Sequence, residues 1–306
     1  KANLDFDKYE SWAIKLNQAE AKDHKAQPMM LNIAWQGIDR AVPYIGWLSS
    51  AEGHTDVTLK EGQQDIYVST KVRPHEKTLL PTGQYNARFD VKGDLLDVER
   101  FHYQAEKGSL TGQAKVKLPN EKQQLAWQAQ LQAQNFNPQT VVATAPVNLL
   151  NGQIKATGFA KPNQQIIQFD QIDLKGQLAQ AGKTETVALK GKSTAALIFH
   201  DQEAGGGFKS FAVNYDGALN ALGHGDGRLK INVAGTPEYL KINQLQHDGV
   251  AGKIYATGTL NLKNQLGWDV DASLVRFKPQ YFVSNLKGEL SGRVKSQGVW
   301  SDKLKR

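Results

Sequence analysis

The sequence contains no cysteine among its 306 residues. Disulfides, thiolate metal sites and a cysteine nucleophile are therefore excluded. It also has no apolar run near the roughly 18 residues that a membrane helix needs, and its first residues lack the apolar core of a signal peptide. The net charge is +7, but Lys and Arg never form a block of five or six. A nucleic-acid partner is not expected from such scattered charge.

Catalytic motifs are absent as well. The sequence has no G-x-S-x-G elbow, no P-loop and no G-x-G-x-x-G before a helix, and its 7 histidines include no pair at the i, i+4 spacing of a zinc helix. Clustered aromatics with paired carboxylates, which a glycan-binding or hydrolytic protein needs, are missing too. We therefore expect no enzyme, no cofactor and no metal site.

Strict alternation of apolar and polar residues fills most of the chain. In one segment Leu125, Trp127, Ala129 and Leu131 alternate with glutamines. A period of two indicates strands with one dry and one wet face. The spacing of such segments predicts roughly twenty antiparallel strands of four to nine residues. Their polar faces carry Gln, Asn, Lys and Thr, so paired charges are not expected.

One stretch departs from this alternation. Between Ile38 and Leu48 the apolar residues recur at close to helical spacing, with Pro43 inside the stretch and Gly46 near its end. This pattern predicts one short, broken helix near residues 38–48.

A long internal repeat organises the chain. Trp127 and Trp268 are 268 − 127 = 141 positions apart, and Pro138 and Pro279 are 279 − 138 = 141 apart. We expect Trp127 and Trp268 to pack in the core, with the lining of a ligand groove as the alternative, and each Phe-x-Pro to end a strand. The predicted division is N-terminal strands in 1–82, a first repeat in 83–158, connecting strands in 159–224 and a second repeat in 225–300. No linker composition separates these parts, so one continuous β structure is expected.

Several of these residues carry a resemblance to a known family. The tryptophan strand Leu125-x-Trp127-x-Ala129-x-Leu131-x-Ala133 and the corner Asn135-Phe136-Asn137-Pro138 resemble the AsmA-like superfamily. Within it, Asn32-Ile33-Ala34-Trp35-Gln36-Gly37-Ile38-Asp39-Arg40-Ala41-Val42-Pro43 and Gly83-Gln84-Tyr85-Asn86-Ala87 look like the middle region of the TamB family. The membrane anchor and the C-terminal segment typical of that family are not found in this sequence.

The resemblance implies an all-β fold, a long antiparallel β-taco or open sandwich-like groove, here with one short helix. It implies a place in the periplasm of a Gram-negative bacterium, in a longer protein anchored in the inner membrane. The implied role is to carry phospholipids between the two membranes, to assist outer-membrane protein assembly, or both. The implied partners are phospholipid acyl chains and, through parts not in this chain, the outer-membrane barrel protein TamA.

Alternation alone leaves a second architecture open, because the dry face of many strands can line an open groove or a closed core. The closed form corresponds to a structural or adhesin-like β-repeat scaffold. For the open form we expect an unspecific aliphatic and aromatic lining. The predicted lining residues are Leu118, Leu125, Leu131, Ile154, Leu174, Phe199, Phe211, Leu229, Ile231, Leu260, Val270 and Leu274.

Overall fold

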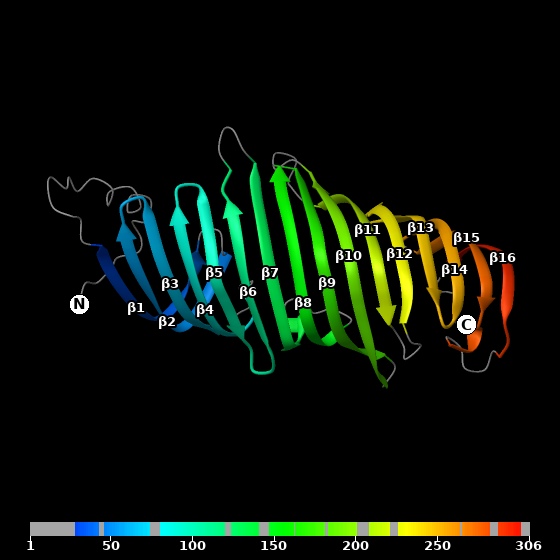
Figure 1. Ribbon diagram of the computed structural model, residues 1–306, viewed down its shortest axis with the longest axis horizontal. Helices are drawn as coiled ribbons and strands as arrows, with labels where there is room; N and C mark the ends of the chain where they lie inside the picture. Colours follow the sequence, from blue (N-terminus) through cyan, green and yellow to red (C-terminus); the bar gives the residue numbers. More distant parts are fainter. Residues whose placement is uncertain are drawn as a thin grey trace.

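The computed structural model contains one antiparallel sheet of sixteen strands, arranged side by side in chain order (Figure 1). The structure describes residues 28–42, 46–73, 80–119, 124–140, 147–161, 163–180, 183–200, 208–220, 226–263, 265–281 and 287–300. Within these ranges the helical elements are two short 3-10 turns, η3 (Pro138–Thr140) and η5 (Pro279–Tyr281). The predicted all-β, antiparallel fold is confirmed.

All strands except β6 are longer than the predicted four to nine residues, so there are fewer strands than expected. For example, Ile172 and Leu174 lie inside a strand of 17 residues. The strands are β1 (Met29–Val42), β2 (Gly46–Lys60), β3 (Gln63–Val72), β4 (Gly83–Lys92), β5 (Leu95–Gln104), β6 (Ser109–Lys117), β7 (Leu125–Phe136), β8 (Val147–Lys161), β9 (Gln164–Gln180), β10 (Lys183–Phe199), β11 (Phe208–Asn220), β12 (Asp226–Thr236), β13 (Tyr239–Gly249), β14 (Gly252–Asn261), β15 (Leu266–Phe277) and β16 (Leu290–Trp300).

The helix expected near residues 38–48 is wrong. Residues 38–42 end β1 and residues 46–48 begin β2, and the two segments pair with each other, Ala41 with Trp47 and Val42 with Gly46. Pro43 leaves too few residues on either side to offset the cost of nucleating a helix. Pairing the two strands satisfies the same backbone groups. Residues 43–45 lie outside the described part of the chain.

The sheet is open. Each strand pairs with its sequence neighbours, and in the described part of the chain β1 pairs with β2 alone and β16 with β15 alone. At a strand spacing of ~4.8 Å, sixteen strands extend over about 70 Å. The closed core that alternation left open is therefore not the architecture of this chain.

Irregularities in the strand pairing recur with a period of eight strands. Register shifts interrupt the pairing at Arg88 and Asn232, which are 232 − 88 = 144 positions apart, and at Val98 and Ile242, 242 − 98 = 144 apart. A third pair of shifts begins at Ala133 in β7 and Leu274 in β15, 274 − 133 = 141 apart. Since β-bulges bend the strands that contain them, the two repeats share the same built-in curvature.

The corner after each tryptophan strand is repeated in backbone detail. Asn135 and Arg276 both have φ +48°. Each donates its backbone N–H over 2.9 Å, to Asn151 Oδ1 and to Ser291 Oγ respectively. The strands then end at Phe136 and Phe277, ahead of η3 and η5. The predicted role of the Phe-x-Pro sequences as strand ends is confirmed.

Candidate functional site

One row of directly paired residues crosses the whole sheet and is almost entirely apolar. From β1 to β16 the row is Leu31, Val57, Ile66, Phe89, Val98, Ala114, Ala129, Ala156, Phe169, Ser193, Tyr215, Ile231, Leu245, Ala256, Ala272 and Val294. Side chains of alternate residues point to the same side of a sheet. We call the side that carries this row the apolar face and the opposite side the polar face.

Charge is excluded from the apolar face over most of its length. From β3 to β16, no Lys, Arg, Asp or Glu occupies a paired position on this face whose side chain the structure describes. Nor does any other described element form a second layer over it, since the contacts between elements run from each strand to its neighbours and from η3 to β8. A large uncovered apolar surface of this kind is typical of a binding site.

The register brings most of the predicted lining residues to the apolar face. Ten of them share it: Leu125, Leu131, Ile154, Leu174, Phe211, Leu229, Ile231, Leu260, Val270 and Leu274. Leu131 and Ile154 face each other directly. Leu118 lies just beyond β6 and is 40% exposed, while Phe199 ends β10 beside a register shift and packs edge-on against Phe208. Their role in holding a ligand stays a prediction.

Two clusters consolidate this face without covering it. In the first repeat, Tyr103 and Phe136 are buried with Ala133, and Tyr85 packs against them. The second cluster centres on Ile172, Tyr215 and Leu229. Burial raises the pKa of the Tyr85, Tyr103 and Tyr215 phenols, and the nearby Tyr103 adds to the effect on Tyr85. The surroundings of these rings are therefore poorly hydrated.

The repeat places equivalent positions at two points along one margin of the apolar face. We call Tyr85, Tyr103 and Phe136 the first rim, and their counterparts in the later repeat, Leu229, His247 and Phe277, the second rim. Tyr103 is 2% exposed and donates its hydroxyl to Thr82 O over 2.8 Å. His247, in contrast, is only half-buried. Alternation predicts that these residues share the apolar face. Only the pairing register of the strands shows that they lie at its margin.

Tryptophans on the apolar face cover glycines on the neighbouring strand. Trp127 pairs with Gly158 and Trp268 with Gly298, and in both cases ring atoms lie 2.5 Å from the point where a Cβ would stand. Trp35 lies over Gly53 in the same manner, a third pair outside the detected repeat. The rings are half-buried on the open apolar face, which favours the alternative that they line a groove over the expectation that they pack in the core. The glycines let each ring lie flat on the sheet.

The polar face carries ion pairs, contrary to expectation. Lys115 pairs with Asp97 at 2.9 Å and Arg293 with Asp271 at 2.6 Å, each across neighbouring strands. Hydrogen bonding to Arg293 holds the pKa of the Asp271 carboxyl below its usual value. The sequence could not show these pairs, because partners on neighbouring strands meet only when the two strands pair in the correct register.

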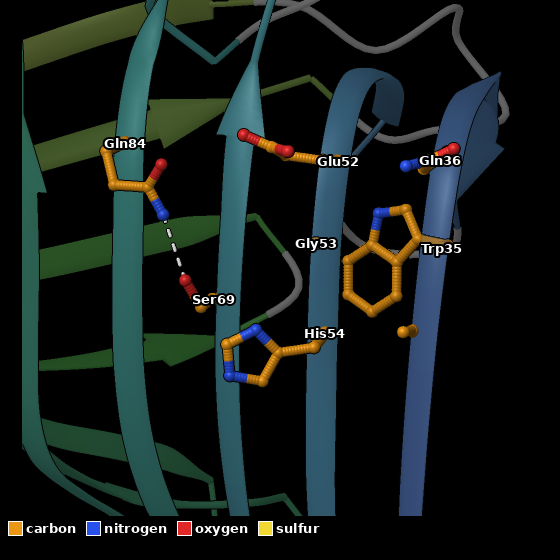
Figure 2. Close-up of a pocket in the computed structure, with 8 residues that line it drawn as sticks. Trp35, Gln36, Glu52, Gly53, His54, Ser69 and Gln84 are labelled. Atoms are coloured by element: carbon orange, nitrogen blue, oxygen red, sulfur yellow. Dashed lines mark hydrogen bonds between the residues drawn. The ribbon is translucent and has the colours of Figure 1, made fainter.

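A depression of about 670 Å³ lies on the polar face of the first strands, where Gln36, Glu52, His54, Ser69 and Gln84 point outward (Figure 2). Gln84 Nε2 donates to Ser69 Oγ over 2.9 Å. Neither the His54 imidazole nor the Glu52 carboxylate has a side-chain hydrogen bond to a described residue. No group of three or more His, Cys, Asp or Glu within the described residues could hold a metal ion.

Comparison with known proteins agrees with this architecture. Residues 75–197 and 182–304 each match the family model described as TamB, N-terminal domain, and together they cover most of the chain. The chain belongs to the TamB family. It is 20% identical, over 303 residues, to the translocation and assembly module subunit TamB of Haemophilus influenzae. The resemblance inferred from the sequence is therefore confirmed.

The matched region is 94% of this chain but only 23% of that relative. No solved structure matches the chain. Among its described residues, no helix is both long enough and apolar enough to cross a membrane. The main features of this stretch of a TamB-family protein are thus the open sheet and its uncharged apolar face.

Proposed function

We propose that this chain forms part of a periplasmic conduit in which the apolar face holds the acyl chains of phospholipids passing between the inner and outer membranes of a Gram-negative cell. The observation that carries the proposal is the apolar row through all sixteen strands, which no described element covers. The family supports a place in the translocation and assembly module. We further propose that the whole protein meets the barrel protein TamA through parts outside this chain.

The energetics favour a lipid that slides. Sheltering an acyl chain from water gains about 0.8 kcal/mol per methylene, or on the order of 10 kcal/mol for sixteen carbons. Moving along the sheet exchanges one aliphatic neighbour for another, such as Leu131 for Ile154. The gain therefore changes little from strand to strand, and no step needs a catalytic group. We accordingly propose a carrier without enzymatic activity.

Assistance to outer-membrane protein assembly is the second candidate, because the same face could shelter the apolar side chains of an unfolded β-strand. The uncovered state of this face supports it, since no described element forms a second layer over the strands. The two functions differ in what the apolar face binds, a lipid or a peptide.

Native mass spectrometry of the purified chain, followed by lipid extraction, tests the proposal. The test variant carries Leu131→Arg and Leu260→Arg on the apolar face. The matched control carries Gln130→Arg and Thr259→Arg, which add the same charge to the polar face of the same two strands. We expect phospholipid with the native chain and the control, and its loss from the test variant with an unchanged β circular-dichroism spectrum. Equal lipid on both variants would contradict the proposal.

A further inference from the structure

The second rim contains a protonatable group on an otherwise uncharged surface. His247 lies on β13, where it pairs with Leu229 of β12 and Ile254 of β14. Among the apolar-face positions from β3 to β16 with described side chains, it is the one residue of the Lys, Arg, His, Asp and Glu types. An imidazole has an ordinary pKa of about 6.5, so it can gain a charge near neutral pH.

Glycines lie beneath and beside this imidazole. Gly249 pairs with Gly252 of β14, and the Cα of Gly227 in β12 lies 3.0 Å from the point where a Cβ of Gly249 would stand. The His247 ring lies over Gly227 and Gly249, with Cε1 at 2.9 Å from that same Gly249 point. The three glycines form a strip without side chains at the ends of β12, β13 and β14, in which Gly227 is buried beneath the ring while Gly249 and Gly252 are partly exposed.

No described charged side chain on the strands around it forms an ion pair with the ring. Asp248 of β13 pairs with Lys253 of β14 on the polar face, at 2.6 Å. Arg228 and Lys230 of β12 bind Asp216 on that same face, and Tyr255 of β14 lies there as well. Arg276 of β15 lies near Lys253. His247 has no hydrogen bond or ion pair with a described residue, and its half-buried ring lies with Nε2 against Gly227.

The first rim shows that the same fold can also bury the margin of the apolar face. Its equivalent of His247 is Tyr103, whose ring lies over Gly83. The centre of the Tyr103 ring is 6.1 Å from that of Phe136 and 4.6 Å from that of Tyr85. Tyr103 is 2% exposed and its hydroxyl is hydrogen-bonded. The equivalent position is therefore buried in the first repeat and partly exposed in the second.

We propose that the second rim is a binding site for the anionic headgroup of a lipid. The protonated His247 imidazole binds the phosphate or carboxylate beside Gly249 and Gly252, and the acyl chain lies inward along Ile231. A headgroup at the margin keeps its hydration while the chain is buried, the arrangement that an amphiphile favours. The inference rests on the proposed function, because it assumes that the apolar face holds acyl chains.

Two probes with the same sixteen-carbon chain test it. Hexadecyl sulfonate is anionic at every pH used, and monohexadecanoylglycerol is neutral. Their dissociation constants are measured below their micelle concentrations at pH ~5.5 and ~7.5, on either side of the ordinary imidazole pKa. The proteins are the native chain, His247→Gln, His247→Lys, and His102→Gln as a control on the polar face of β5.

We expect the native chain and the control to bind the sulfonate about fivefold more tightly at the lower pH, the change that a one-unit rise of the imidazole pKa on binding produces between these two pH values. His247→Gln should abolish this difference, and His247→Lys should bind tightly at both values. The neutral probe should respond to neither pH nor substitution. A pH response that persists in His247→Gln, while both probes bind, overturns this inference alone. Failure of the native chain to bind either probe overturns the proposed function as well.

Discussion

The first and second rims share their backbone features but differ in how their side chains pack. Register shifts, a left-handed residue at the corner and a glycine under the rim residue recur at both. At the first rim Phe136 is 6% exposed and packs against two tyrosines, whereas at the second rim Phe277 and His247 are half-buried. The fold thus determines where a rim lies, and the side chains decide how tightly it packs.

The largest expected difference between the rims is in stability. Phe136→Ala removes a ring from a packed cluster, and such changes cost about 3–5 kcal/mol. Phe277→Ala removes a ring that is half-buried, so its cost should be well under half of that. Denaturant unfolding of both variants measures the two free energies. Equal losses would mean that the second rim is as tightly packed as the first.

A shared backbone device should give equal effects at the two rims. Gly108 has φ +90° and Gly252 has φ +96°, and a Cβ at either would meet the backbone carbonyl of Asn135 or Arg276. We expect Gly108→Ala and Gly252→Ala to lower the free energy of unfolding by a similar amount, about 1–3 kcal/mol each. Gly267→Ala is the control, since its nearest contact would be an ordinary 3.5 Å. A neutral Gly252→Ala beside a costly Gly108→Ala would show that the corners differ.

Alkaline pH should destabilise the first rim, which contains two tyrosines, and not the second rim, which contains none. Burial raises the pKa of Tyr85 and Tyr103, so the folded state holds these protons more tightly than the unfolded state. Their contribution to stability is therefore complete below the ordinary value of about 10 and is lost as pH rises through the raised values. Tyrosinate absorbance should show late-titrating phenols, fewer in Tyr85→Phe/Tyr103→Phe. Tyr215 should remain late in that variant. Normal titration of every tyrosine would contradict the burial of the first rim.

The smallest effect is expected on the polar face. The positions of Arg293 and Asp271, an ion pair of the second repeat, are occupied in the first repeat by Gln153 and Gln130. Asp271→Gln/Arg293→Gln should change stability little, because exposed ion pairs contribute little. The lowered pKa of Asp271 means that its contribution is present above the ordinary carboxyl pKa and fades as pH falls through the lowered one. A large loss on thermal unfolding would contradict this.

Much of the fold could be predicted because alternation fixes strand character and face membership locally. Leu125 and Leu131 share a face in any register, since strand side chains alternate. The helix near residues 38–48 was predicted wrongly because spacing alone cannot distinguish a short broken helix from two strands that pair across a proline. There, tertiary pairing determined the structure.

The candidate site was less predictable, because pairing partners decide it. Nothing local in the sequence indicates that Tyr103 is sealed by Phe136, or that His247 faces a strip of glycines from three strands. The ion pair between Lys115 and Asp97 is not predictable from the sequence for the same reason. The internal repeat does align Tyr103 with His247, and that substitution was the available signal that the two rims differ.

Site-specific photocrosslinking tests the central claim, that acyl chains occupy the apolar face, most directly. A photoreactive amino acid is placed at Leu131 or Val270 on the apolar face, and at the adjacent Gln132 or Asp269 on the polar face. After irradiation of cells that produce the whole protein, we expect lipid adducts at the first two positions and none at the second two. Adducts of equal yield on both faces, or none at Leu131 and Val270, would contradict the account.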